Sequence, residues 1–137
     1  MMLYLDTSSL IKLYVKEQGS DEVKSFATKA STIITSIVTY AESRAAFAKQ
    51  YRKGELSEED YQDTKAIFET DWKDYLIVAL GEKIVKHAGD LAEEHGLRGF
   101  DAIHLASYLF IKRRIKSEIH FSSFDDRLNK AANNETL

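Results

Sequence analysis

The sequence predicts an α/β fold, arranged as a three-layer α/β/α sandwich with a mostly parallel central sheet of four or five strands. Short apolar runs alternate with longer segments in which apolar residues recur at helical spacing, and this alternation is typical of domains with a parallel sheet. The length of 137 residues, 44% of them hydrophobic and 30% charged, is typical of one globular domain. We therefore expect a single domain over residues 1–137.

The first predicted strand and helix lie at the start of the chain. Met2–Leu5 is an apolar run too short for a helix, and it ends at Asp6. The segment Thr7–Ser9 then offers hydroxyl groups of the kind that cap helices, ahead of apolar residues at helical spacing. Gly19–Ser20 breaks this helix and begins a second one.

The middle of the chain predicts a second strand and two long helices. Thr32–Ser36 is short and β-branched, which favours a strand. A helical pattern follows over Val38–Arg52 and carries Glu42 in an early turn. Gly54 ends this helix, and Ser57 has the position of an N-cap for the next one.

The remainder of the chain predicts two more strands with helices after them. Tyr75–Leu80 is apolar throughout, as expected for a buried parallel strand, and a helical pattern follows it. A further helix has Asp101 in its first turn and runs to Arg114. Ile119–Ser123 predicts the fourth strand, and Asp125 follows it just before a short last helix.

The composition excludes several classes of protein. Without cysteine the chain has no disulfide framework and no thiolate chemistry, which fits a cytoplasmic location. We expect no membrane association, because no run of about 18 apolar residues is present and the N-terminal segment lacks the basic region of a signal peptide. The net charge of −3 argues only superficially against a nucleic-acid partner, since setting aside four metal-bound acids leaves a weakly positive remainder.

Four acids occupy positions that a parallel sheet brings to one rim. Asp6 and Asp125 follow the first and fourth strands, whereas Glu42 and Asp101 lie in early turns of helices. Because ligands bind at the carboxyl ends of parallel strands, we expect the four side chains to converge. Clustered carboxylates repel each other unless a cation lies between them, and hard divalent cations prefer oxygen ligands. Such a cluster can activate water for phosphoryl displacement.

Each acid also has a purely structural interpretation. Asp101 and Asp125 could cap helices, and Asp6 could close an Asx turn at the end of a strand. Glu42 could complete a capping box with Thr39. The spacing of the residues alone leaves these alternatives open.

The histidines show no sign of a zinc site. His87, His95 and His120 lack the spacing of zinc ligands. His104 lies one turn after Asp101 on an otherwise apolar helix, and we interpret it as a packed structural histidine rather than a metal ligand or general base.

Four short motifs follow one another along the chain: Leu5-Asp6-Thr7-Ser8, Thr39-Tyr40-Ala41-Glu42, Phe100-Asp101-Ala102-Ile103-His104-Leu105-Ala106 and Ser123-Phe124-Asp125-Asp126-Arg127-Leu128. In this order and at these separations, the set resembles PIN domains, specifically the small stand-alone type of VapC-like ribonuclease toxins. The resemblance covers essentially the whole chain and implies a PIN-like nuclease domain.

The resemblance implies roles for six residues: the metal-binding and catalytic acids Asp6, Glu42, Asp101 and Asp125, and the supporting hydroxyls Ser8 and Ser123. Asp126 is adjacent to Asp125, and only the register with Ser123 favours Asp125 as the fourth acid. The cofactor implied by the resemblance is Mg²⁺ or Mn²⁺.

The function implied by the resemblance is a metal-dependent endoribonuclease that cleaves single-stranded or looped RNA and acts as the toxin of a toxin–antitoxin pair. It also implies a VapB-like antitoxin as partner, and a homodimer. One alternative is a stand-alone RNA-processing nuclease of the same fold. Another is a non-catalytic receiver-like module, but a receiver carries two adjacent acids after its first strand, and here Thr7 follows Asp6.

Overall fold

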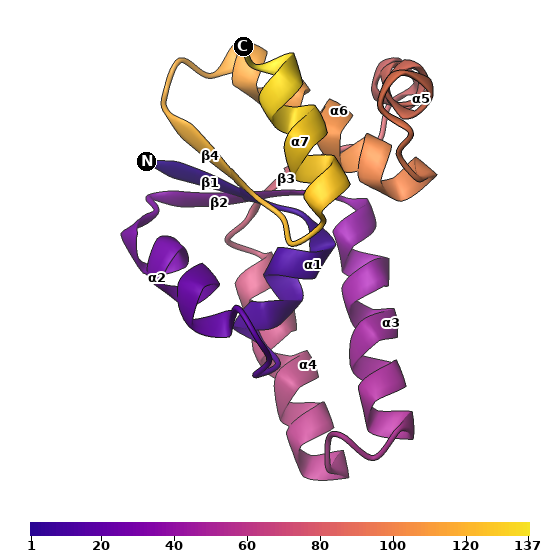
Figure 1. Ribbon diagram of the computed structural model, residues 1–137. Helices are drawn as coiled ribbons and strands as arrows, with labels where there is room; N and C mark the ends of the chain where they lie inside the picture. Colours follow the sequence, from indigo (N-terminus) through magenta and orange to yellow (C-terminus); the bar gives the residue numbers. More distant parts are fainter.

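The computed structural model describes residues 1–137 and has one four-stranded sheet: β1 (Met2–Leu5), β2 (Thr32–Ser36), β3 (Leu76–Val78) and β4 (Ile119–Ser122). All neighbouring strands are parallel, in the order β3-β2-β1-β4. The first strand in the sequence, β1, therefore lies inside the sheet between β2 and β4 (Figure 1). The predicted parallel α/β sheet is confirmed, with four strands.

The helices cover both faces of this sheet: α1 (Thr7–Leu10), the 3₁₀ helix η1 (Ile11–Leu13), α2 (Ser20–Lys29), α3 (Val38–Arg52), α4 (Glu58–Trp72), α5 (Glu82–His95), α6 (Gly99–Arg114) and α7 (Asp126–Glu135). In Figure 1 the helices α5, α6 and α7 lie on one side of the strands, and α1 to α4 lie on the other. The predicted three-layer sandwich is confirmed.

Local signals account for several helix ends. The hydroxyl of Ser57 accepts a hydrogen bond from the Asp60 amide at 3.0 Å and so caps α4. Gly96 ends α5 with φ of +64°, a left-handed conformation that glycine adopts without strain. Helix α3 has the bounds expected from the helical pattern of Val38–Arg52.

Two apolar cores lie on opposite faces of the sheet, because side chains alternate along each strand. In β1, Tyr4 packs into the core beneath α5, α6 and α7, together with Leu105 of α6. Leu3 and Leu5 point the other way, into the core that contains Phe47 of α3 and Phe68 of α4. Both cores hold β1 in place, and with it the residue that follows β1.

The third strand differs from the sequence-based expectation. Tyr75–Leu80 was expected to form a buried strand, but only Leu76–Val78 is β structure, and the side chains of Leu76 and Leu80 are exposed. The reason is that β3 lies at the edge of the sheet and pairs with β2 alone. A run of apolar residues does not distinguish an edge strand from a central one.

No helix of this structure is both long and apolar enough to cross a lipid bilayer.

Candidate active site

Asp6 lies directly after the central strand β1 and is almost fully buried, with 3% of its surface exposed. Its Oδ1 accepts hydrogen bonds from the Ser9 amide at 2.9 Å and from the Ser8 hydroxyl at 2.7 Å. Asp6 is thus the N-cap of α1, a role that the sequence pattern had assigned to the hydroxyls of Thr7–Ser9. The same contacts fix the direction in which its carboxylate points.

The loop after β4 is joined to Asp6. The Ser123 hydroxyl donates to Asp6 Oδ2 at 2.6 Å and accepts from the Asp125 amide at 3.0 Å. The Phe124 amide donates to the Ser8 hydroxyl at 3.1 Å. The structure therefore places Ser8 and Ser123 against Asp6, where the resemblance put supporting hydroxyls.

Glu42 belongs to a hydrogen-bonded group on α3, α1, α6 and β1. Its Oε1 accepts a hydrogen bond from the Thr7 hydroxyl and lies 3.3 Å from His104 Nε2. The same His104 nitrogen lies 3.1 Å from the Thr7 hydroxyl, and His104 Nδ1 lies 3.0 Å from the Tyr4 hydroxyl. Glu42 does not form the capping box considered above, because the Thr39 hydroxyl bonds with that of Thr35.

The hydrogen bonds around His104 indicate a proton on its Nε2 atom. Because the Thr7 hydroxyl donates to Glu42, it can only accept from Nε2, which lies 3.1 Å from Thr7 and 3.3 Å from Glu42. Burial, and then the Asp6 carboxylate, raise the pKa of Tyr4, so its hydroxyl keeps its proton beside Nδ1. Burial alone raises the pKa of Glu42, but the hydrogen bonds from His104 and Thr7 outweigh it, and the pKa is lowered. The network keeps Glu42 ionised.

Asp101 stands in the first turn of α6, half-buried. Burial raises its pKa, and the carboxylates of Asp125 and Asp6 raise it further, whereas Arg98 opposes this change. The Arg98 Nε atom lies 3.5 Å from Asp101 Oδ2, but the Arg98 side chain is mostly in solvent. The pKa of Asp101 is thus raised first by burial and then by the charges of Asp125 and Asp6, so both of these acids act on Asp101.

Asp125 is the N-cap of α7, and its Oδ1 accepts from the Leu128 amide at 2.8 Å. Its charge acts on Asp101, whereas Asp126 is not among the charges that shift the pKa of Asp101. Asp126 lies one residue further, inside the first turn of α7. The assignment of the fourth acid to Asp125 stays a prediction.

Two hollows meet at Asp101. One of about 580 Å³ is lined by Glu42 and Asp101 together with Arg98 and Phe100. The other, of about 350 Å³, is lined by Asp101 together with both Asp125 and Asp126. Asp6 lines neither hollow, but its charge acts on Asp101, and the Ser123 hydroxyl bonds with both the Asp6 carboxylate and the Asp125 amide.

A family model described as PIN domain matches residues 3–134. The chain belongs to the PIN domain family. Ribonuclease VapC45 of Mycobacterium tuberculosis is 36% identical over 110 residues, which make up 80% of this chain and 76% of that relative. The resemblance inferred from the four motifs is confirmed.

Solved structures with low sequence identity share the PIN-domain fold. VapC20 of Mycobacterium tuberculosis, described as a sarcin–ricin loop cleaving toxin, superposes with a TM-score of 0.66 at 17% identity and with 94% of each chain covered. A toxin–antitoxin complex from Klebsiella pneumoniae gives a TM-score of 0.61 at 21% identity, with 90% of this chain and 88% of that chain covered.

The acids of this PIN domain suit a divalent cation in their chemistry. All four offer carboxylate oxygens, and a cation would offset the repulsion that raises the pKa of Asp101. No three of the four acids have ligand atoms within 4.8 Å of one another. A cation such as Mg²⁺ keeps several waters and uses only one or two carboxylates directly, so this wider spacing is compatible with it.

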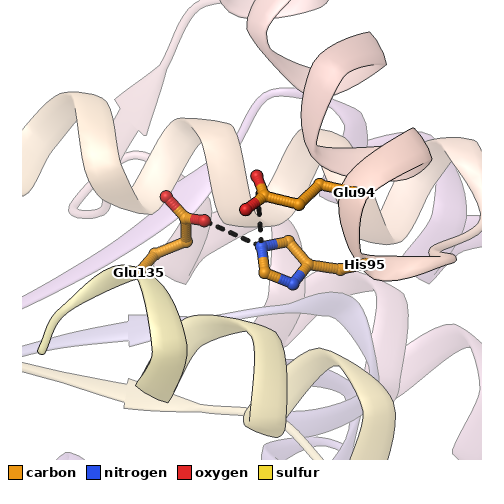
Figure 2. A group of neighbouring side chains, drawn as sticks. All are labelled: Glu94, His95 and Glu135. Atoms are coloured by element: carbon orange, nitrogen blue, oxygen red, sulfur yellow. Dashed lines mark hydrogen bonds and ion pairs between the residues drawn. The ribbon is translucent and has the colours of Figure 1, made fainter.

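One group of side chains in the PIN domain does bring three possible ligand atoms within 4.8 Å, and it lies elsewhere. Figure 2 shows Glu94 and Glu135 pointing toward the same ring nitrogen of His95. Nε2 of His95 lies 2.8 Å from Glu135 and 3.7 Å from Glu94. The nitrogen that would bind a metal is engaged with Glu135, and Arg127 and Lys130 line the same hollow. The arrangement is that of a histidine–carboxylate contact, an ion pair when His95 is protonated, that joins the C-terminal ends of α5 and α7.

Sequence reasoning missed the residues that orient Glu42. His104 is indeed packed, with 2% of its surface exposed, but it also bonds with Glu42, which the structural interpretation did not include. Thr7 was considered only as a helix cap. Its position next to Asp6 was the one available signal, because a residue beside a strand-end acid lies at the same rim.

Proposed function

We propose that this PIN domain, taken as one nuclease domain over residues 1–137, is a divalent-metal-dependent endoribonuclease that cleaves single-stranded or looped RNA. The proposal is carried by one observation, the gathering of acids at the rim of the sheet. Glu42 and Asp101, from helices far apart in the sequence, line one hollow there. The charges of Asp6 and Asp125 both act on the Asp101 carboxyl. Family membership and the ribonuclease relative support the reaction class.

In the proposed reaction, Asp6, Glu42, Asp101 and Asp125 would hold Mg²⁺ or Mn²⁺, one or two of them directly and the others through bound water, and the ion would supply positive charge to the phosphodiester and activate water. Ser8 and Ser123 fix the Asp6 carboxylate, and Thr7 with His104 keeps Glu42 ionised. An oxygen of water forms the new bond to phosphorus, the bond from phosphorus to the 3′ oxygen breaks, and the 3′ oxygen gains a proton. The products carry a 5′-phosphate and a 3′-hydroxyl.

The test of this reaction is cleavage of total RNA in Mg²⁺, Mn²⁺ or EDTA, with identification of the new ends. We expect metal-dependent cleavage that leaves 5′-phosphates. Asp6→Asn and Asp101→Asn should lower the rate by about 100-fold or more, since each removes a charge that the reaction uses. Cyclic 2′,3′-phosphate products, or full activity in EDTA, would contradict the mechanism.

The fourth acid is tested by a matched pair of variants. Asp125→Asn removes the charge that raises the pKa of Asp101, whereas Asp126→Asn removes an adjacent charge without that effect. We expect Asp125→Asn to lower activity, less severely than Asp101→Asn, and Asp126→Asn to leave it close to that of the wild type. The reverse order would assign the role to Asp126.

We further propose that the protein is the toxin of a toxin–antitoxin pair that acts in the cytoplasm on cellular RNA. Support comes from the relatives, which include VapC ribonucleases and a protein in a toxin–antitoxin complex. A bidentate arginine of a VapB-like antitoxin would supply positive charge to the acids in place of a metal. A homodimer remains a prediction, which sedimentation of the purified protein tests.

Partnership is tested by co-purification with the product of the neighbouring gene, followed by Arg→Glu changes in its tail. We expect a stable complex and loss of inhibition in the charge-reversed partner. If inhibition persists with every tail arginine reversed, direct blocking of the acids is wrong. If no neighbouring product associates, a stand-alone RNA-processing nuclease replaces the toxin.

A further inference from the structure

Two aromatic residues directly precede predicted acids, and only one of their rings is free. The Phe124 ring, before Asp125, has the Lys12 Nζ atom 4.5 Å from its centroid and packs closely against Gly19. The Phe100 ring, before Asp101, contacts no other ring and no cation, and 56% of its surface is exposed.

The position of Phe100 distinguishes it from other exposed apolar residues. Single exposed apolar side chains are common on protein surfaces and carry no meaning by themselves. Phe100, however, lines the same hollow of about 580 Å³ as Glu42 and Asp101. Any ligand held by these two acids therefore lies within reach of an uncovered aromatic face.

A cationic side chain lies beside this aromatic face. Arg98 lines the same hollow, and 86% of its side chain is exposed. Its only ion pair is the 3.5 Å contact with Asp101, and pairs of such exposure contribute little, so the guanidinium can turn to another anion. An aromatic face next to a free guanidinium is the combination that binds single-stranded nucleic acid, by stacking on a base and pairing with a phosphate.

We propose that Phe100 is a stacking platform for the nucleobase next to the cleaved phosphodiester, and that Arg98 binds an adjacent phosphate. This inference rests on the proposed ribonuclease function and deepens it. Every base has a π-face, so the platform selects for an unstacked base rather than for its identity. A base within a duplex is already stacked on its neighbours, and the platform therefore favours unpaired RNA.

A peptide segment of a protein partner fits this hollow less well. Only two apolar side chains, Phe100 and Ile103, line it, and the remaining lining is charged or glycine. An apolar peptide anchor needs a deeper apolar pocket to lose its contact with water. A planar base needs one ring face and neighbouring charge, both of which are present.

The experiment compares Phe100→Leu, which keeps the apolar volume without a π-face, with Phe100→Tyr, which restores the ring. Ile67→Ala is the control, because Ile67 is equally exposed, at 56%, on α4 and outside the site. The substrate is an oligonucleotide that spans a site cleaved by the wild type in total RNA. We expect Phe100→Leu to raise KM about 5- to 100-fold with a smaller change in kcat, and Phe100→Tyr to recover most of the loss.

A direct signature of stacking comes from 2-aminopurine placed beside the cleavage site, with RNA bound by the inactive Asp6→Asn protein. Fluorescence should be quenched on binding, and this quenching should be lost when Phe100→Leu is added. In the same background, Arg98→Gln should weaken binding and reduce its dependence on salt, because one phosphate contact is lost.

Several results would overturn the stacking role. Equal KM values for Phe100→Leu and the wild type would do so, as would undiminished quenching. If Phe100→Leu weakened binding of the antitoxin but not of RNA, the residue would belong to a protein interface. A wild type that cleaves no RNA would instead refute the proposed function, which the first cleavage assay shows before any variant is made.

Discussion

Hydroxyl groups orient the acids of this PIN domain. Ser8 and Ser123 donate to the two oxygens of Asp6, and Thr7 donates to Glu42. Buried carboxylates without such donors would turn toward any available hydrogen-bond donor or take up protons. The hydroxyls therefore belong to the site although they carry no charge.

Ser123→Ala tests this orienting role. We expect cleavage to fall about 10- to 100-fold, the usual effect of removing a partner behind a metal ligand, while the protein stays folded. The measurement is kcat/KM as a function of Mg²⁺ concentration. Ser31→Ala is the matched control, since the Ser31 hydroxyl bonds only with a backbone oxygen in an exposed segment. Equal activity of the two variants would show that Asp6 needs no such support.

The raised pKa of Asp101 predicts how the metal-free protein responds to pH. A carboxyl whose pKa is higher in the folded than in the unfolded state binds its proton more tightly when folded. Its contribution to stability is therefore full below the unfolded pKa of about 3.9 and is lost as the pH rises through the folded pKa.

In EDTA, Asp101→Asn should consequently melt at a higher temperature than the wild type at pH 7, and the difference should vanish in acid. Thermal melts across this pH range provide the measurement. Asp126→Asn controls for the loss of a negative charge at a helix N-terminus, which by itself is slightly destabilising. A lower Tm for Asp101→Asn at pH 7 would mean that repulsion among the acids is weaker than their positions indicate.

Among the helices, α5 and α7 are joined at their C-terminal ends by the 2.8 Å contact between His95 Nε2 and Glu135, which is an ion pair when His95 is protonated. Both side chains are largely buried, whereas the pair between Lys86 and Glu82 on the same α5 is exposed. Burial leaves the first pair less screened by solvent. The two pairs should therefore differ in strength.

A double-mutant cycle with His95→Gln and Glu135→Gln should give a coupling energy of about 1 kcal/mol or more. The coupling energy from the corresponding cycle for Lys86 and Glu82 should stay below about 0.5 kcal/mol. Urea unfolding at pH 6 supplies both sets of values. A marked rise in Tm on adding Zn²⁺, lost in His95→Gln, would contradict the ion-pair interpretation and indicate a metal site.

The ends of a helix can be predicted where the sequence carries a local capping residue or a glycine that ends the helix. Ser57 and Gly96 delimit helices through a cap and a left-handed turn, and both act locally. The third strand could not be predicted correctly, because the extent of β3 depends on pairing with β2 at the sheet edge. Edge position is a property of the assembled sheet and leaves no mark in an apolar run.

The rim positions of the strand-end acids could be anticipated from the sheet, whereas the histidine partner of Glu42 could not. Asp6 and Asp125 follow strands, so the parallel sheet rule alone brings them to one rim. The contact of His104 with Glu42 joins residues that are 62 positions apart, and it depends on how α6 packs against β2. Nothing in the local pattern around His104 specifies that contact.

At the scale of the whole molecule, the sheet separates two cores that share no side chains. Ile84 of α5 packs in one core and Phe68 of α4 in the other. Ile84→Val should lower the free energy of unfolding by about 0.5–1.5 kcal/mol, and Phe68→Leu should lower it by a similar amount, because each substitution leaves a small cavity.

The free energy of unfolding of the double variant should fall by the sum of the two single decreases, to within about 0.5 kcal/mol, since the two residues lie in different cores. Chemical denaturation of the wild type, the two single variants and the double variant gives the three changes in the free energy of unfolding. Ile34→Val with Ile84→Val, both within one core, is the matched pair in which departure from additivity is expected. Strong coupling across the sheet would show that the strands transmit strain between the cores.

The strand order also bears on protein synthesis. The ribosome makes β1 and Asp6 first, whereas Ser123, whose hydroxyl holds Asp6, comes 117 residues later with the end of β4. At about 5–20 residues per second this delay lasts roughly 6 to 23 seconds. Throughout that time the nascent chain lacks one wall of its site. The surroundings of Asp6 can therefore be completed only after the last strand of the sheet has been synthesised.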